Sequence, residues 1–150
     1  MYAQRVSCYR KKISGVLQDD ILFAGHLAGN ISFFDPNLDM ERVKSCAKLA
    51  GIIDEILALP MGFGTLVGDM GSVLSGGQKQ RILLARALYA QPTILFLDVA
   101  TSHLDIKKEQ EINKNLRSLN LTIIMIAHRK ETIIDIADRT IQLQDSLPFR

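Results

Sequence analysis

The stretch LSGGQKQRILLARALYAQPTILFLD, residues 74–98, carries the signals that decide the fold. Ser75 is a residue type that commonly caps a helix, and the sequence after it predicts a helix over 75–90. The apolar residues of this helix recur on one face, which predicts that they face a core. Its basic residues are expected to reach water: Lys79, Arg81 and Arg86.

A continuous apolar run over 93–97 predicts a buried strand that ends at Asp98. Similar runs at 122–127 and 140–143 predict two more strands, and the charged segment 105–119 predicts a helix between them. Strands that are apolar throughout, with intervening helices, are typical of a parallel sheet covered on both sides. We therefore predict an α/β fold.

The earlier part of the chain has a different pattern. A short β-prone run at 13–17 is followed by a segment, about 21–90, that we interpret as a helical insertion ending in the 75–90 helix. Within it, 39–50 and 52–59 predict two helices, with Asp39 as N-cap of the first and Gly51 between them.

Composition narrows the class of protein. The chain has 150 residues, the size of one domain, and a formal net charge of +2. It has no concentrated basic patch of the kind that nucleic-acid readers carry, so no nucleic-acid partner is expected. Cys8 and Cys46 have no metal or disulfide spacing, and no apolar run is long enough to span a bilayer.

Polar residues at the ends of predicted elements indicate a site. Ser75, Gly76 and Gly77 open a helix, where free N–H groups and the helix dipole suit an anion such as phosphate, although a simple capped helix explains them equally well. Asp98 ends a buried strand, where a carboxylate can hold Mg²⁺. His128 ends another such strand, whereas His26 and His103 are interpreted as structural.

LSGGQ, then ILFLD, then SHLD, then a strand ending in histidine, in that order, resembles the ATP-binding cassette (ABC) ATPases. The resemblance runs from about residue 9 onward and implies a P-loop NTPase-like ABC ATPase fold. The phrases VLQDDILFAG, NISFF and GDMGSVLSGGQKQRILLARALY resemble bacterial exporters of toxins or bacteriocin-type peptides more narrowly. Those proteins carry a transmembrane domain, often with a peptidase domain, ahead of the ATPase.

The resemblance implies a role for each matching residue. Ser75, Gly76, Gly77 and Gln78 would touch the γ-phosphate of ATP held mainly by a second ATPase domain. The other implied roles are these: Asp98 supports Mg²⁺, Gln18 touches Mg²⁺ or the attacking water, His128 contacts the γ-phosphate, and Asp105 lies at the dimer seam. The implied cofactors are ATP and Mg²⁺ in a dimeric site.

Two departures from the family pattern bear on activity. None of the ten glycines has the phosphate-loop spacing G-x-x-x-x-G-K-[S/T], and only 17 residues precede Gln18, so the phosphate-loop strand is expected to be absent and the fold incomplete. Val99 stands where the family has a glutamate that polarises the attacking water, and a valine accepts no proton. We therefore expect no ATP hydrolysis by this chain alone.

The whole chain, 1–150, is accordingly interpreted as a partial nucleotide-binding domain. Its helical subdomain is 21–90, and its α/β core, 91–150, carries the Walker B, D-loop and H-loop motifs. The expected partners are the transmembrane domain of an ABC exporter and a second ATPase domain, on the cytoplasmic side of the bacterial inner membrane. The alternative is a non-catalytic module that lends its LSGGQ motif to an intact ATPase. A DNA-repair or translation ABC protein is disfavoured, because only 56 residues separate Gln18 from Ser75.

Overall fold

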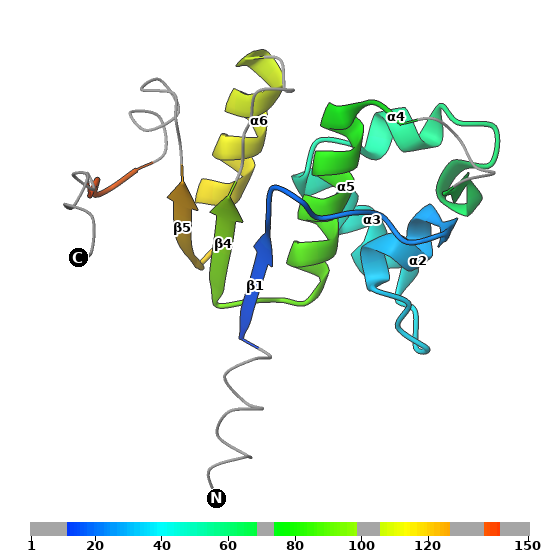
Figure 1. Ribbon diagram of the computed structural model, residues 1–150, viewed down its shortest axis with the longest axis horizontal. Coiled ribbons are helices and arrows are strands. Elements are labelled where there is room, and N and C mark those ends of the chain that lie inside the picture. The colour runs from blue at the N-terminus through cyan, green and yellow to red at the C-terminus, as the bar shows by residue number, and fades with distance from the viewer. Residues whose placement is uncertain (1–11, 69–73, 99–105, 127–136, 142–150) are drawn as a thin grey trace, which may run out of the picture.

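The structure is a computed structural model that describes residues 12–68, 74–98, 106–126 and 137–141 (Figure 1). A parallel sheet has the strand order β1-β4-β5, formed by Ile13–Val16, Ile94–Asp98 and Thr122–Ile126. Helix α6, Ile106–Arg117, lies between β4 and β5 in sequence. This arrangement confirms the predicted α/β fold with a parallel sheet.

Helices fill the chain between β1 and β4. They are α2 (Leu27–Ser32), α3 (Met40–Leu49), α4 (Ile53–Leu57), the 3₁₀ helix η1 (Gly62–Gly64) and α5 (Gly76–Tyr89). Strand β2 (Gly25–His26) precedes α2, and strand β3 (Leu66–Val67) follows η1. The two strands pair antiparallel, so the start of α2 and the end of η1 lie close together. Helix α5 lies between the sheet and the other helices, so it contributes to the core on both sides (Figure 1).

Local sequence explains where the helices begin and end. The side chain of Asp39 accepts a hydrogen bond from the Arg42 N–H and caps α3, as predicted. Gly51 takes a φ of +65° between α3 and α4, a left-handed conformation that favours glycine. His26 caps α2 by accepting from the Gly29 N–H at 2.7 Å, which agrees with its structural interpretation.

The basic residues of α5 do not all reach water, so that part of the sequence interpretation was wrong. Lys79 is exposed, but Arg81 is only 7% exposed, and Arg86 is partly buried. The helix is surrounded by packed elements on most of its circumference, and each arginine finds partners on a segment far away in sequence. Arg81 pairs with Glu55 of α4, and Arg86 bonds to Asn30 of α2.

Within the described residues, helices cover one face of the sheet, and the expected cover of the other face stays a prediction. Alternate strand residues, including Leu95 and Leu97, face α5 and α6 and are buried. The residues between them lie on the opposite face and keep 40–54% of their surface exposed: Ile13, Phe96, Ile124 and Ile126. Both described helices near the sheet, α5 and α6, pack on the same side, so no described helix covers the other, apolar side.

The strand expected at 140–143 is not formed at the residues that can be judged. Thr140 and Ile141 lie in no strand, and the remainder of that segment lies outside the described residues. Among the described strands, β5 therefore has β4 as its neighbour on one side and none on the other.

Candidate functional site

The carboxyl ends of the strands meet at one edge of the sheet. Val16 at the end of β1 pairs with Leu97, and Asp98 at the end of β4 pairs with Ile126 at the end of β5. Asp98 is half-buried at this edge. In open α/β sheets this edge is where ligands bind.

Gln18 lies at the same edge, in a turn immediately after β1. The Leu17 N–H donates to the Asp20 carboxylate at 2.8 Å, and the Asp20 N–H donates back to the Leu17 carbonyl at 3.2 Å. These bonds close the turn and leave Gln18 at its exposed tip. The position suits a side chain that must reach a ligand over the sheet edge.

The start of α5 is also directed to this edge. Helix α5 runs opposite to the strands, since its last turn leads directly into the start of β4 (Figure 1). Gln80 and Arg81, in the second turn of α5, share a cavity wall with Val16 and Leu97 near the strand ends. The structure therefore places the Ser75 end of the helix, Gln18 and Asp98 on one side of the molecule.

A capping box fixes the first turn of α5. The Ser75 Oγ accepts from the Gln78 N–H at 3.2 Å, while the Gln78 Oε1 accepts from the Ser75 N–H at 2.9 Å. The N–H groups of Gly76 and Gly77 have no carbonyl acceptor within the helix, because they belong to its first turn. Free N–H groups at a helix start, with the positive end of the helix dipole, can bind a phosphate.

The turn after β1 is held to α5 by a network that the sequence did not reveal. The Arg86 guanidinium donates to the Asn30 side chain at 2.7 Å, to the Asn30 carbonyl at 2.8 Å and to the Ile21 carbonyl at 3.1 Å. Asn30, which is fully buried, also exchanges two hydrogen bonds with the Phe23 backbone. Burial lowers the pKa of Arg86, and the nearby Asp20 carboxylate opposes this. The one sequence signal for this network is Asn30 itself, a polar residue within the mostly apolar segment of α2.

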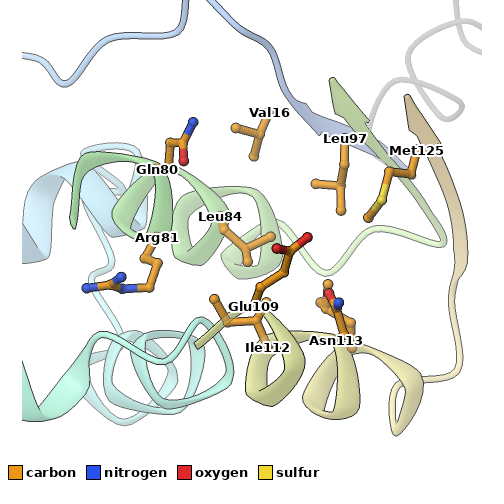
Figure 2. Close-up of a pocket in the computed structure, with 10 residues that line it drawn as sticks. Val16, Gln80, Arg81, Leu84, Leu97, Glu109, Ile112, Asn113 and Met125 are labelled. Carbon is orange, nitrogen blue, oxygen red and sulfur yellow. The ribbon is translucent and has the colours of Figure 1, made fainter. Parts of the chain in front are cut away.

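A partly open pocket of about 40 Å³ lies between α5, α6 and the sheet (Figure 2). Val16, Leu97 and Met125 form its sheet side, and Figure 2 shows the polar side chains of Gln80, Glu109 and Asn113 around it. A space of this volume holds only a few water molecules, so it is too small for a nucleotide.

The described residues offer a limited set of metal donors. Within the described ranges, no group of three or more His, Cys, Asp or Glu side chains could hold a metal ion. Asp98 supplies a single carboxylate, and Gln18 supplies an amide oxygen. Such a set fits Mg²⁺ bound through nucleotide phosphates, since Mg²⁺ in proteins is commonly held by one or two carboxylates, waters and phosphate oxygens.

Three other residues of the expected site lie outside the described residues: Val99, Asp105 and His128. His103 lies outside them as well. None of the described helices is long and apolar enough to cross a bilayer.

Comparison with known proteins gives consistent relatives. The family described as ABC transporter matches residues 1–102. The chain is 46% identical over 138 residues to the colicin V secretion/processing ATP-binding protein of Escherichia coli, covering 92% of this chain and 20% of that protein. It is 46% identical over 137 residues to the RTX-III toxin translocation ATP-binding protein of Actinobacillus pleuropneumoniae, covering 90% of this chain and 19% of that protein.

The fold has a solved counterpart of the same kind. A bacterial Atm1-family ABC exporter with ATP bound superposes with a TM-score of 0.77 at 42% sequence identity. The match covers 85% of this chain and 23% of that one. The chain thus spans about a fifth of the length of the relatives that it matches.

Proposed function

Because the chain belongs to the ABC transporter family, we propose that it is part of the ATPase domain of a bacterial exporter. The exporter would couple ATP hydrolysis to the movement of a toxin, bacteriocin or other peptide across the inner membrane. The names of the 46%-identical relatives support this class of cargo. The observation that carries the proposal is the capped, glycine-containing start of α5 on the same side of the molecule as Gln18 and Asp98.

The start of α5 would bind the γ-phosphate of ATP held by a second ATPase domain. The N–H groups of Gly76 and Gly77 are donors at the positive end of the helix. The Ser75 hydroxyl accepts from the Gln78 N–H, and its own proton remains available for a phosphate oxygen. These donors orient the phosphate, which is the main contribution that a protein makes to phosphoryl transfer.

Asp98 and Gln18 would hold Mg²⁺ at the sheet edge. An ion held there would supply positive charge to offset the negative charge that develops during phosphoryl transfer. The half-buried carboxylate of Asp98 is fixed by the strand pairing of β4, whereas Gln18 sits on an exposed turn. Gln18 is therefore the residue suited to change position with the nucleotide state.

We propose roles for three further residues by family membership. His128 would contact the γ-phosphate, and Asp105 would lie at the seam between two ATPase domains. Val99 takes the position of the general base, so the attacking water lacks a proton acceptor there. Loss of a positioned base costs about 10²–10⁴ in rate, and this chain by itself would not hydrolyse ATP.

The segment 21–90 would form the helical subdomain that faces the transmembrane partner. The aromatic patch of Phe23, Phe33 and Phe34 supports this placement, since these rings contact one another and are 44–65% exposed. The Arg86 guanidinium lies 4.9 Å from the Phe23 ring centre and holds the patch against α5. The protein would then be peripheral, held at the cytoplasmic side of the inner membrane through its partner.

Val99 also supports a second candidate function. The chain could act as a non-catalytic module that lends its LSGGQ motif to an intact ATPase partner. Both candidates use the same phosphate-binding helix start. In the first, the chain is part of the exporter's own ATPase domain. In the second, it is a separate module that pairs with the ATPase domain of another, intact transporter. Co-purification with a separate, full-length transporter would favour the second.

The test is association driven by ATP. The unaltered chain is titrated against the ATP-binding portion of the E. coli colicin V relative with Mg²⁺ and a non-hydrolysable ATP analogue, and complex formation is followed by fluorescence anisotropy. We expect association only with nucleotide, weakened at least about tenfold by Gly76→Asp, which adds a negative charge at the helix start. Gly64→Ala is the matched control, because a side chain there meets nothing within 4 Å. Equal binding by Gly76→Asp would contradict the proposed site.

A further inference from the structure

The side chain of Gln78 is already occupied at both ends. Its Oε1 accepts from the Ser75 N–H at 2.9 Å, and its Nε2 donates to the Glu55 Oε2 at 2.9 Å. A glutamine side chain has one amide group, so these two bonds fix its orientation. In this arrangement the side chain is directed toward α4 and the helix cap.

Glu55 of α4 joins two positions on α5. Its second oxygen, Oε1, accepts from the Arg81 Nη2 at 2.6 Å. The Arg81 side chain is 8% exposed and that of Glu55 is 34% exposed. This is the one ion pair of Arg81 in the part of the chain that the structure describes, and its Nε is buried without a hydrogen bond.

We propose that Glu55 is a positioning residue for the phosphate-binding end of α5. Through Gln78 and Arg81 it holds the first two turns of the helix, and so holds the Ser75 hydroxyl and the N–H groups of Gly76 and Gly77 in place for the phosphate. Gln78 acts in the same way and does not itself touch the nucleotide. This proposal rests on the proposed function and names how its site is kept in order.

If these donors are already fixed before the nucleotide binds, less conformational entropy is lost on binding. The helix start carries two consecutive glycines, which have more conformational freedom than other residues and gain order only from neighbouring contacts. The charges also fit, since the Arg81 guanidinium balances the Glu55 carboxylate. Without that balance, a carboxylate close to the helix start would repel a phosphate.

The experiment removes the hydrogen bond between Gln78 and Glu55 and then rebuilds it with donor and acceptor exchanged. Glu55→Ala removes the acceptor, and Gln78→Glu keeps the cap on Ser75 but places two carboxylates together. The double variant Glu55→Gln with Gln78→Glu rebuilds the bond in the opposite direction and leaves an amide oxygen as the acceptor for Arg81. The control is Asp54→Ala, the exposed neighbouring acid, whose side chain makes no hydrogen bond or ion pair among the described residues.

Two measurements are made on the full chain. Nucleotide-dependent association with the same colicin V relative, in Mg²⁺ and the ATP analogue, gives the dissociation constant. The amide exchange of residues 77–79 and the side-chain amide signal of Gln78, by NMR without nucleotide, report the order of the helix start. Circular dichroism establishes that each variant is folded under these conditions.

We expect Glu55→Ala and Gln78→Glu each to weaken association about tenfold and to speed amide exchange at 77–79. The double variant should restore slow amide exchange at 77–79, and Asp54→Ala should stay within about twofold of the unaltered chain in association. If Glu55→Ala weakens association while amide exchange at 77–79 is unchanged, Glu55 does not act by ordering the helix start and the proposal is wrong. Full binding by a folded Glu55→Ala would also overturn it.

The outcome also separates this proposal from the proposed function. Failure of the unaltered chain to associate with nucleotide present would overturn the proposed function, and the positioning role with it. Normal association that is insensitive to Glu55 would leave the proposed function standing and remove the positioning role alone.

Discussion

Ile82 on α5 and Ile124 on β5 are the same residue type in two parts of the molecule, yet their exposed fractions are 0% and 47%. Ile82 lies in the helical half, which we define as α2, α3, α4, η1 and α5. Ile124 lies in the sheet half, defined as β1, β4, α6 and β5. The helical half surrounds its apolar residues with its own elements and one face of the sheet, whereas the sheet half leaves one face uncovered.

The proposed nucleotide site is divided between these halves. Ser75 and its glycines belong to the helical half, and Gln18 and Asp98 belong to the sheet half. The proposed phosphate-binding helix start thus rests on a packed core. The edge proposed to hold Mg²⁺ rests on a sheet of which the described helices cover one face.

The largest difference between the halves is expected from truncating the two isoleucines. Ile82→Ala should lower the free energy of unfolding by about 2–5 kcal/mol, because it leaves a cavity in a packed core. Ile124→Ala should cost less than about 1 kcal/mol, because the side chain is already half exposed. Urea denaturation measures both. Equal losses would contradict the comparison, since they would place Ile124 in a packed environment.

The network that joins α5 to α2 and to the segment after β1 should be nearly as sensitive. Asn30→Ala removes the partner of the Phe23 backbone and of Arg86, so about 1–3 kcal/mol of unfolding free energy should be lost through unsatisfied groups. The matched control is Asn37→Ala, which alters an exposed residue in a loop. Urea denaturation of the two variants checks this, and a loss no greater than that of the control would show that the network contributes nothing.

Burial in the helical half should also make the free energy of unfolding depend on pH. Burial raises the pKa of the Cys46 thiol from 9.0 to about 11. Below pH 9 the thiol is protonated in both states and has no effect. Between pH 9 and 11 the unfolded chain loses this proton while the folded chain keeps it, so stability should fall with rising pH, by at most about 1.4 kcal/mol per unit.

The measurement compares the unaltered chain with Cys46→Ala over this pH window. The variant loses some packing at every pH, but its stability should fall less steeply above pH 9. Parallel curves would mean that the thiol ionises equally in both states, and therefore that it is not buried in the folded chain.

The smallest stability effect belongs to the bare face of the sheet. Ile124→Thr with Ile126→Thr keeps β-branched side chains, so the unfolding free energy should change by less than about 0.5 kcal/mol. Aggregation should decrease, because exposed apolar strands with open edges pair with other chains. Light scattering against concentration tests this. Ile123→Thr, on the covered face, is the control and should destabilise the chain without improving solubility.

Local signals in the sequence were sufficient for much of the helical half. Ser75 and Asp39 cap their helices as predicted, since a cap depends on residues within one turn. The strands 94–98 and 122–126 were expected from continuous apolar runs, and the parallel pairing followed from the intervening helix. These features need no knowledge of distant parts of the chain.

The errors came from contacts between distant segments. Arg81 was expected in water because nothing near it in sequence indicates Glu55, which lies 26 residues away. Cover on both faces of the sheet stays a prediction, because the described helices lie on one face and apolar side chains do not say which element covers the other. The Arg86–Asn30 joint, 56 residues apart, was invisible for the same reason. The roles of Val99, Asp105 and His128 stay predictions.

Hydrogen exchange of the full chain compares the two halves most directly, because it measures the stability of each in the same molecule. Within the helical half, the amides of residues 81–88 in α5 should be protected. Within the sheet half, those of 123–126 in β5 should exchange faster, since among the described residues β5 has one unpaired edge and one uncovered face. Strong protection of 123–126 in a monomer, independent of protein concentration and equal to that of α5, would contradict the account and show that the sheet is stable without further cover.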